Sequence, residues 1–380
     1  MTKSHNSFYE SLGVRRIING ASWITTYGGS LMPDAVVEAM NEASGWFVDI
    51  HDLNEKAGEI IAHTTGAEAG LVTAGSAAGM VLQAAACMTG NDPAKIWSLP
   101  DTSRMKNEII IHRGHQVGYT HSYRAAGAHL VEIGSVHSTE KWELETAINS
   151  QTAAVAYVYG PRQSGALDLK EVVDIAHSKD VPVIVDASAM LPPPENLHKF
   201  INEGADLVSF SGGKGVLGPQ STGILCGKSE LIQAAYANSA PNSSGVARAA
   251  KVCKEEIAGL ITALKLFVET DHQLVAKNWR EKSSHIVDQL GLIEGLKIEL
   301  IEADYSARDS RLNFASAKIT FLNHWSGKSR DQIVQSLEDG DPSIRIGVST
   351  YDQSISVLPV CLQTDEEQIV AERLKELLSS

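Results

Sequence analysis

The chain has 380 residues, of which 43% are apolar and 21% are charged; this composition is that of a globular protein, and the length predicts two or three domains. No tract approaches the ~20 apolar residues of a membrane span, and the amino end, MTKSHNSFYESLG, lacks the apolar core of a signal peptide, so we expect a cytoplasmic protein. The formal net charge of −14, without any basic run, argues against nucleic acid as a partner.

From about residue 70 to residue 227, apolar runs alternate with helical patterns. The runs are GLVTAG (70–75), NEIIIH (107–112), AHLVEIG (128–134), AAVAYVYG (153–160), VPVIVDAS (181–188), ADLVSFS (205–211) and TGILCG (222–227). Such continuous runs are typical of strands buried on both faces of a mostly parallel sheet. Apolar residues recur at helical spacing in TEKWELETAIN (139–149) and LDLKEVVDIAHSKD (167–180). This order predicts a doubly wound α/β domain.

After residue 240 the pattern changes. The small residues of SAPNSSGVAR (239–248) predict a loop at a domain boundary. Residues 254–290 have the pattern of one long amphipathic helix, and short strands are expected at 297–304, 316–322, 343–348 and 354–360. The final helix is expected to begin with a capping box formed by Thr364 and Glu367. A sheet of short strands covered by helices predicts a smaller α+β domain.

The cysteines and histidines give no sign of a metal site. The chain has four cysteines, which lie far apart and form no C-x-x-C pair: Cys87, Cys226, Cys253 and Cys361. This argues against a disulfide framework or a zinc cluster and fits a reducing compartment. Three histidines lie closer together, His112, His115 and His121, but their spacing matches no ligand pattern, so we expect no metal.

A carboxylate and a lysine follow two neighbouring strands. Asp186 ends VPVIVD, and Lys214, in SFSGGKG (209–215), follows ADLVSFS. Only one crossover segment separates them, so both should lie at the carboxyl edge of the sheet, where α/β proteins bind ligands. This pair is what pyridoxal 5'-phosphate (PLP) requires, because a lysine binds its aldehyde covalently and a carboxylate pairs with its ring nitrogen. The glycines around Lys214 are expected to allow tight turns against the cofactor.

The phosphate of such a cofactor needs hydrogen-bond donors. TAGSAAGM (73–80) follows a strand and opens a helix, so the backbone amides of Gly75, Ser76 and Ala77 would meet a phosphate at a helix amino terminus. Hydroxyl donors would come from Ser209 and Ser211. Each feature alone has a simpler explanation: a strand-end aspartate caps a turn, a Gly-Gly-Lys is a loop, and small residues pack closely. Their order, with each at a strand end, favours a cofactor site.

This order resembles that of the fold-type I PLP enzymes, the aspartate-aminotransferase-like superfamily. More narrowly, the chain resembles the group related to selenocysteine synthase (L-seryl-tRNA(Sec) selenium transferase) and, within it, the D-glucosaminate-6-phosphate ammonia-lyase-like proteins. The matching stretches keep their order over most of the chain: INGASWITTYGGS (18–30), TGAEAGLVTAGSAAGM (65–80), residues 99–134, VPVIVDASAMLPP (181–193), SFSGGKGVLGPQSTGILCGK (209–228), KEEIAGLITAL (254–264) and PSIRI (342–346).

The resemblance implies a mostly parallel doubly wound sheet with a smaller α+β C-terminal domain, and it implies three regions. Residues 1–45 would be an N-terminal segment that packs with the small domain and with a dimer partner. Residues 46–248 would form the large PLP-binding domain, and residues 249–380 the small domain. Because sites of this fold commonly draw on two subunits, we expect at least a homodimer.

The resemblance also implies roles for single residues. Lys214 would carry the cofactor, Asp186 would pair with its ring nitrogen, and Ser188 would lie near the ring. His115 would stack on the ring, although a loop histidine bonded to the backbone is the alternative. Gln220, on the loop after the lysine, would lie near the phosphate. Two arginines are candidates to bind a substrate carboxylate, and a solvated surface position is the alternative for each: Arg345 and Arg162.

The implied reaction is the elimination of water and ammonia from a β-hydroxy amino acid or an amino sugar acid, with or without a phosphate, to give a 2-keto acid. The amine of Lys214, neutral in a desolvated site, would remove the α-proton, and Lys214 or His115 would protonate the leaving hydroxyl. A racemase, aldolase or transaminase would share this machinery, and selenium transfer or a non-catalytic PLP-binding protein are further alternatives.

One stretch departs from the pattern. Where close relatives tend to have an asparagine-proline turn, this chain has Leu358-Pro359-Val360, which argues against assuming glucosaminate phosphate as the substrate. The basic residues that would bind a second phosphate are scattered rather than clustered: Arg104, Lys106 and Arg124.

Overall fold

The computed structural model describes residues 8–160, 165–307 and 309–379. Two compact units emerge, a larger one formed by Ser30–Thr270 and Ser306–Arg311 and a smaller one formed by Met1–Gly29, Asp271–Tyr305 and Leu312–Ser380. The domain boundaries expected after residues 45 and 248 remain a prediction. No helix within the described ranges has both the length and the apolar character needed to cross a bilayer.

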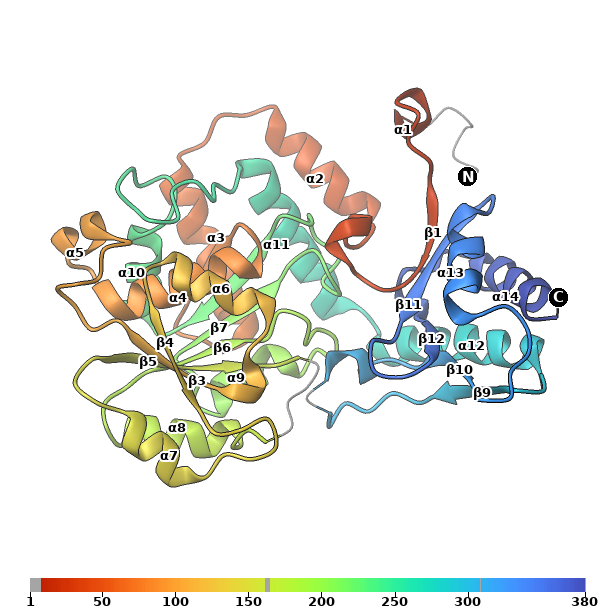
Figure 1. The fold of residues 1–380 in the computed structure, drawn as a ribbon. Coiled ribbons are helices and arrows are strands. Elements are labelled where there is room, and N and C mark those ends of the chain that lie inside the picture. Colours follow the sequence, from red (N-terminus) through yellow and green to blue (C-terminus); the bar gives the residue numbers. More distant parts are fainter. Residues whose placement is uncertain (1–7, 161–164, 308, 380) are drawn as a thin grey trace. The chain divides into compact units, whose positions relative to one another are not determined.

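A seven-stranded sheet forms the centre of the larger unit (Figure 1). Its strand order is β2 (Ala69–Thr73), β8 (Gly223–Gly227), β7 (Leu207–Ser211), β6 (Val183–Asp186), β5 (Thr152–Val158), β3 (Glu108–His112) and β4 (His129–Ile133). From β7 to β4 all neighbours are parallel, whereas β8 is antiparallel to both β7 and β2. The predicted mostly parallel sheet, with all seven strands, is confirmed.

Both faces of this sheet are buried, which explains the continuous apolar runs. On β3, Ile109 and Ile111 belong to one apolar cluster and Ile110 belongs to another on the opposite face. The first face is covered by α4 (Gly75–Thr89), α6 (His121–Ala125) and α10 (Ser229–Ala237). The second is covered by α2 (Asp34–Ser44), α3 (Ile50–Thr65), α7 (Lys141–Ala147), α8 (Leu169–His177), α9 (Asn196–Asn202) and α11 (Lys254–Glu269). The short helix α5 (Pro93–Ser98) follows α4.

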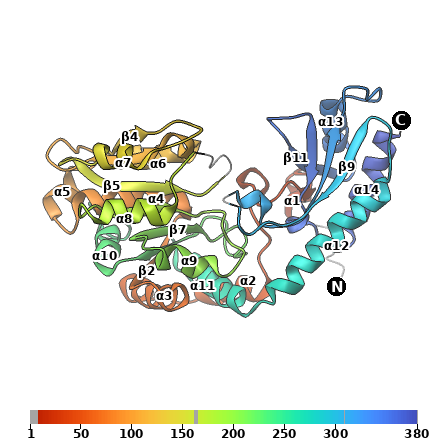
Figure 2. The ribbon, with the colours of Figure 1, turned by 90° about the horizontal axis from the view of Figure 1, so that it is seen from below.

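The smaller unit is built on a five-stranded sheet. Its order is β1 (Ile17–Gly20), β11 (Ser343–Val348), β12 (Ser354–Val357), β10 (Ser316–Phe321) and β9 (Leu296–Ile301). Only the β1–β11 pair is parallel. Helices α12 (His272–Leu290) and α14 (Glu366–Leu378) pack on each other and, with α13 (Arg330–Asp339), enclose one apolar core (Figures 1 and 2). Helix α1 (Phe8–Ser11) precedes β1.

Two details of the sequence prediction are wrong. The single helix expected over residues 254–290 is two helices, because the Asp271 carboxylate accepts the N–H groups of Gln273 (3.1 Å) and Leu274 (3.0 Å) and caps a new helix there. The capping box at Thr364 does not form. Helix α14 instead starts after Asp365, which has a φ of 66° and makes no side-chain cap.

Candidate active site

The carboxyl ends of β6 and β7 bring the two central residues of the predicted site together. Asp186 ends β6 and is register partner of Ser209 on the neighbouring parallel strand β7. Lys214 follows β7, in the loop that leads into β8. Asp186 is 3% exposed and Lys214 is half-buried, so both have lost much of their contact with water. Asp186 and Lys214 are therefore close, as predicted, because the strands that precede them are neighbours in the sheet.

The two side chains shift each other's protonation. Burial raises the pKa of the Asp186 carboxyl, while the N–H of Ser188, which donates to Oδ1 at 3.0 Å, and the charge of Lys214 act in the opposite direction. Burial lowers the pKa of the Lys214 amine, and the charge of Asp186 opposes this change. The result is an amine that loses its proton more easily than an ordinary lysine, beside a carboxylate that needs a cation.

The loop around Lys214 is held by close backbone packing. A Cβ at Gly213 would lie 2.3 Å from the Cα of Gln220, and a Cβ at Gly215 would lie 2.2 Å from the carbonyl oxygen of Leu191. Both glycines therefore permit protein backbones to meet closely, and the expectation that they allow tight turns against the cofactor remains a prediction. Gln220 itself is exposed, and Ser30 Oγ donates to the carbonyl of Gly213 at 3.1 Å.

Helix α4 begins, as predicted, directly after β2, with Gly75 at a φ of +74°. The residue before it, Ala74, has no side-chain oxygen, so within the described residues no side chain caps the first-turn N–H groups. They are therefore suited to an anion. Ser209 Oγ donates to the carbonyl of Ser76 at 3.3 Å. The hydroxyl proton of Ser209 is thus used within the protein, and the expected contact of Ser209 with phosphate remains a prediction.

The remaining expected contacts on this edge are less direct. The backbone N–H of Ser211 donates to the carbonyl of Ser188 at 3.2 Å, which ties the end of β7 to the segment after Asp186. Ala77 lies exposed in the first turn of α4. Roles of Ser188, Ser211 and Ala77 in binding a cofactor remain predictions.

His115 is fully buried just after β3 and is held by the neighbouring strand β5. The backbone N–H of Val158 donates to its Nδ1 at 3.3 Å, so Nδ1 serves as a hydrogen-bond acceptor. The ring lies edge-on to Tyr157, with centroids 4.5 Å apart, and His112 is 4.9 Å away. Tyr157 was not predicted, and its only signal was an aromatic residue within AAVAYVYG.

No group of three or more histidine, cysteine, aspartate or glutamate side chains in the described ranges is arranged to hold a metal ion.

Of the two arginine candidates, only Arg345 lies in the part of the chain that the structure describes. Arg345 lies on β11 of the smaller unit, where its guanidinium pairs with the Glu338 carboxylate at 2.7 Å. Its role toward a substrate remains a prediction. Arg162 lies outside the described residues.

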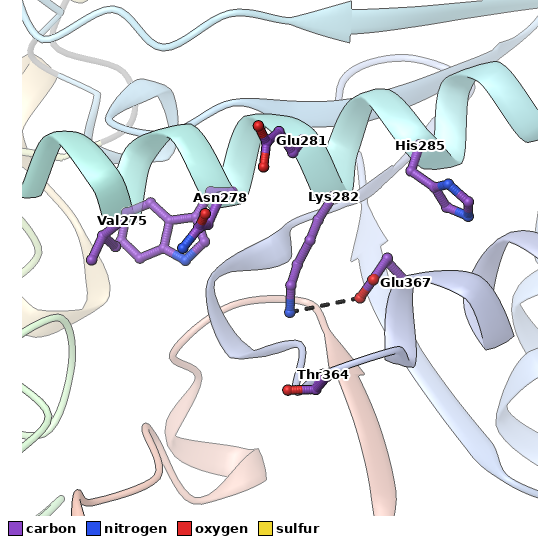
Figure 3. Close-up of a pocket in the computed structure, with 8 residues that line it drawn as sticks. Val275, Asn278, Glu281, Lys282, His285, Thr364 and Glu367 are labelled. Atoms are coloured by element: carbon purple, nitrogen blue, oxygen red, sulfur yellow. Dashed lines mark ion pairs between the residues drawn. The ribbon is translucent and has the colours of Figure 1, made fainter.

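A cavity of about 570 Å³ in the smaller unit contains none of the predicted site residues (Figure 3). It lies between α12 and the start of α14, and Lys282 projects into it toward Glu367, 3.7 Å away. The Lys282 amine donates to the carbonyls of Leu362 (2.6 Å) and Gln363 (2.8 Å). Because that cation is already satisfied by the protein, we assign Lys282 a structural role.

The residues at the sheet edge fit PLP. A buried carboxylate suits a protonated ring nitrogen, a lysine with a lowered pKa suits an aldehyde, and an uncapped helix start suits a phosphate.

Comparisons with known proteins agree with this fit. The profile of the L-seryl-tRNA selenium transferase (SelA) family matches residues 19–278. A 5'-C-glycyluridine monooxygenase-decarboxylase from a Streptomyces species is 32% identical over 99% of this chain and 93% of its own length. D-glucosaminate-6-phosphate ammonia lyase from Salmonella typhimurium is 35% identical over 80% of each chain. A solved structure of D-glucosaminate-6-phosphate ammonia-lyase superposes with a TM-score of 0.84, at 30% identity over 99% of both chains. The chain therefore belongs to the SelA family of fold-type I PLP-dependent enzymes, as its sequence motifs predicted.

Proposed function

We propose that this protein is a PLP-dependent ammonia-lyase that eliminates water from a β-hydroxy amino acid or an amino sugar acid. Hydrolysis of the resulting enamine takes up one water, releases ammonia and gives a 2-keto acid. The observation that carries the proposal is the pair formed by Asp186 and Lys214 at adjacent strand ends, where each side chain shifts the other's pKa. The identity with D-glucosaminate-6-phosphate ammonia lyase supports the type of reaction. Bound PLP would supply an electron sink for the charge that develops at the substrate α-carbon.

The residues of this chain would divide the work. The Lys214 amine, with its pKa lowered by burial, takes the α-proton as a general base. Asp186 stabilises the protonated ring nitrogen as its ion-pair partner. The first-turn amides of Gly75, Ser76 and Ala77 hold the phosphate, with Ser211 and Gln220 as further donors. His115 presents its ring to the cofactor, with Nδ1 fixed by the Val158 N–H.

Substrate recognition is assigned to Arg345, with Arg162 as a second candidate. A planar guanidinium binds a carboxylate by two parallel hydrogen bonds, and Glu338 already offers Arg345 such a partner. A substrate carboxylate would therefore have to replace Glu338. D-glucosaminate 6-phosphate and smaller β-hydroxy amino acids are the substrates to test first.

Oxygen-dependent decarboxylation is a second candidate function. It is favoured by the 32% identity to the Streptomyces monooxygenase-decarboxylase, which extends over nearly the whole chain. Both reactions would start at the same lysine, so the products distinguish them. Elimination releases ammonia and a 2-keto acid without oxygen, whereas the second reaction consumes O₂ and releases CO₂.

The test is a panel of D- and L-hydroxy amino acids and amino sugar acids, with and without phosphate, assayed for 2-keto acid, ammonia and O₂ uptake. We expect keto acid and ammonia in equal amounts, and at least a thousandfold loss of rate in Lys214→Ala. Asp186→Asn should lose at least a hundredfold. A requirement for an amino acceptor would indicate a transaminase instead. Protein that binds no PLP, or that keeps its activity in Lys214→Ala, would contradict the proposal.

The proposal includes a cytoplasmic location and at least a homodimer. Trp46, Phe47 and Val48 form a run of exposed apolar residues between α2 and α3, with 70%, 104% and 50% of their surface accessible. A second copy of the chain would cover such a surface. Light scattering on the wild type and on Phe47→Ser tests this: we expect a dimer that is weakened in the variant, and a monomeric wild type would contradict it.

A further inference from the structure

Gln83 is a buried polar residue on the face of α4 that packs against the large sheet. It is fully buried, and its neighbours along the helix, Met80, Leu82 and Ala84, are buried apolar residues. A buried amide in such surroundings costs free energy unless its donors and acceptor are satisfied. The hydrogen bonds of the Gln83 amide therefore have to account for its burial.

The amide of Gln83 joins two strands. Its Nε2 donates to the carbonyl of Val185 at 3.0 Å and to the carbonyl of Leu207 at 3.3 Å. Two carbonyl acceptors fix the orientation of the amide, because the reverse orientation would point oxygen at oxygen. On its other side, the hydroxyl of Tyr123, also fully buried, donates to Oε1 over a longer distance of 3.4 Å.

These acceptors lie beside the candidate active site. Val185 immediately precedes Asp186, and Leu207 begins β7, the strand that leads to Lys214. The helix that carries Gln83 is the one whose first turn begins at Gly75. One side chain thus connects three elements: the helix that begins at the turn suited to phosphate, the strand that ends in the carboxylate and the strand that leads to the lysine.

We propose that Gln83 is a positioning residue that fixes α4 against β6 and β7 and so sets the spacing between the phosphate-binding turn and the Asp186–Lys214 pair. Apolar side chains resist sliding of a helix only weakly, whereas a satisfied buried hydrogen-bond network specifies one position. The inference rests on the proposed function for the identity of the ligand. The mechanical coupling of α4 to β6 and β7 does not depend on the proposed function.

The test compares Gln83→Met with Thr89→Val. Methionine keeps the length of glutamine but removes all three hydrogen bonds. Thr89 is the matched control: it is buried on the same helix, and its Oγ1 donates to Ala85 at 2.9 Å and accepts from Asn238 at 3.0 Å, away from β6 and β7. Three quantities are measured on the full chain: the melting temperature, the Kd for PLP, and amide hydrogen exchange without added cofactor.

We expect Gln83→Met to weaken PLP binding at least tenfold and to speed exchange at residues 73–80 and 181–188. Thr89→Val should lower the melting temperature similarly while keeping the Kd within twofold and exchange in those segments unchanged. Unchanged Kd and exchange in Gln83→Met would overturn the inference and leave Gln83 a packing residue. If Gln83→Met does not fold, Tyr123→Phe replaces it in the test, because it removes the hydroxyl that donates to Gln83 Oε1. Faster amide exchange at residues 181–188 in Tyr123→Phe would support the inference, and unchanged exchange would overturn it.

Failure of the proposed function gives a different result. If the wild type binds no PLP, the ligand assignment fails, and the exchange comparison still decides whether Gln83 couples α4 to β6 and β7.

Discussion

Replacing Gly79 with alanine tests the close contact between α4 and β7 beside the helix start. A Cβ at this position would lie 2.4 Å from the Oγ of Ser209 and 3.3 Å from its Cβ. The first distance is far below van der Waals contact, so the Ser209 side chain or one of the two elements must shift, and overpacking of this kind costs roughly 1–3 kcal/mol. The helix preference for alanine over glycine offsets about 1 kcal/mol. We expect Gly79→Ala to lower the free energy of unfolding by up to about 2 kcal/mol.

Ser209→Ala provides the decisive comparison because it removes the clashing oxygen. Alone it should cost about 0.5–1.5 kcal/mol, through loss of the hydrogen bond to Ser76. In that background Gly79→Ala should be neutral, or stabilising by up to about 1 kcal/mol. The double-mutant cycle therefore predicts a coupling of at least about 1 kcal/mol. Urea unfolding of the four proteins, followed by circular dichroism, measures it. Equal costs of Gly79→Ala in the two backgrounds would refute the reasoning.

Three other predictions concern further buried or charged residues of the two units. Asp206→Ala should lower the free energy of unfolding by about 2–3 kcal/mol, because it removes a buried carboxylate, 1% exposed, that accepts the N–H of Val183 at 2.6 Å. Lys228, the ion-pair partner of Asp206, is the control: an equal loss of stability in Lys228→Ala would contradict this explanation. Lys282→Met should cost about 1–2 kcal/mol by urea unfolding, since two backbone carbonyls lose their donor; unchanged stability would argue against its structural role. Asp186→Asn removes a charge that raises the pKa of Lys214, so the pH midpoint for acylation of that amine, followed by mass spectrometry, should fall; a rise would contradict the electrostatic coupling.

The larger sheet was predictable because its strands are buried on both faces. In Glu108–His112 the three consecutive isoleucines face alternate clusters, so no polar residue interrupts the run. Parallel neighbours then place strand ends at one edge, which is why Asp186 and Lys214 could be paired from their order alone.

Other details could not be predicted from the sequence pattern. The apolar period continues across the break at Asp271, so the capping signal was masked. The atoms that face Gly213 and Gly215 are backbone atoms, which have no sequence signature. Gln83 stands alone in SAAGMVLQAAACM, but its acceptors lie 102 and 124 positions away, so its role was visible only after folding.

The antiparallel direction of β8 has a consequence for how the lysine segment can vary. Ser211 and Gly223 are register partners, so the segment between them leaves and re-enters the sheet at one point. Asp186 instead precedes a crossover that includes α9. The segment that carries Lys214 is therefore a hairpin loop and not a crossover, although it packs against α11 through Gly212 and Pro219. Substitutions at its exposed positions, such as Gln220, change the surroundings of the amine without altering a crossover connection of the sheet.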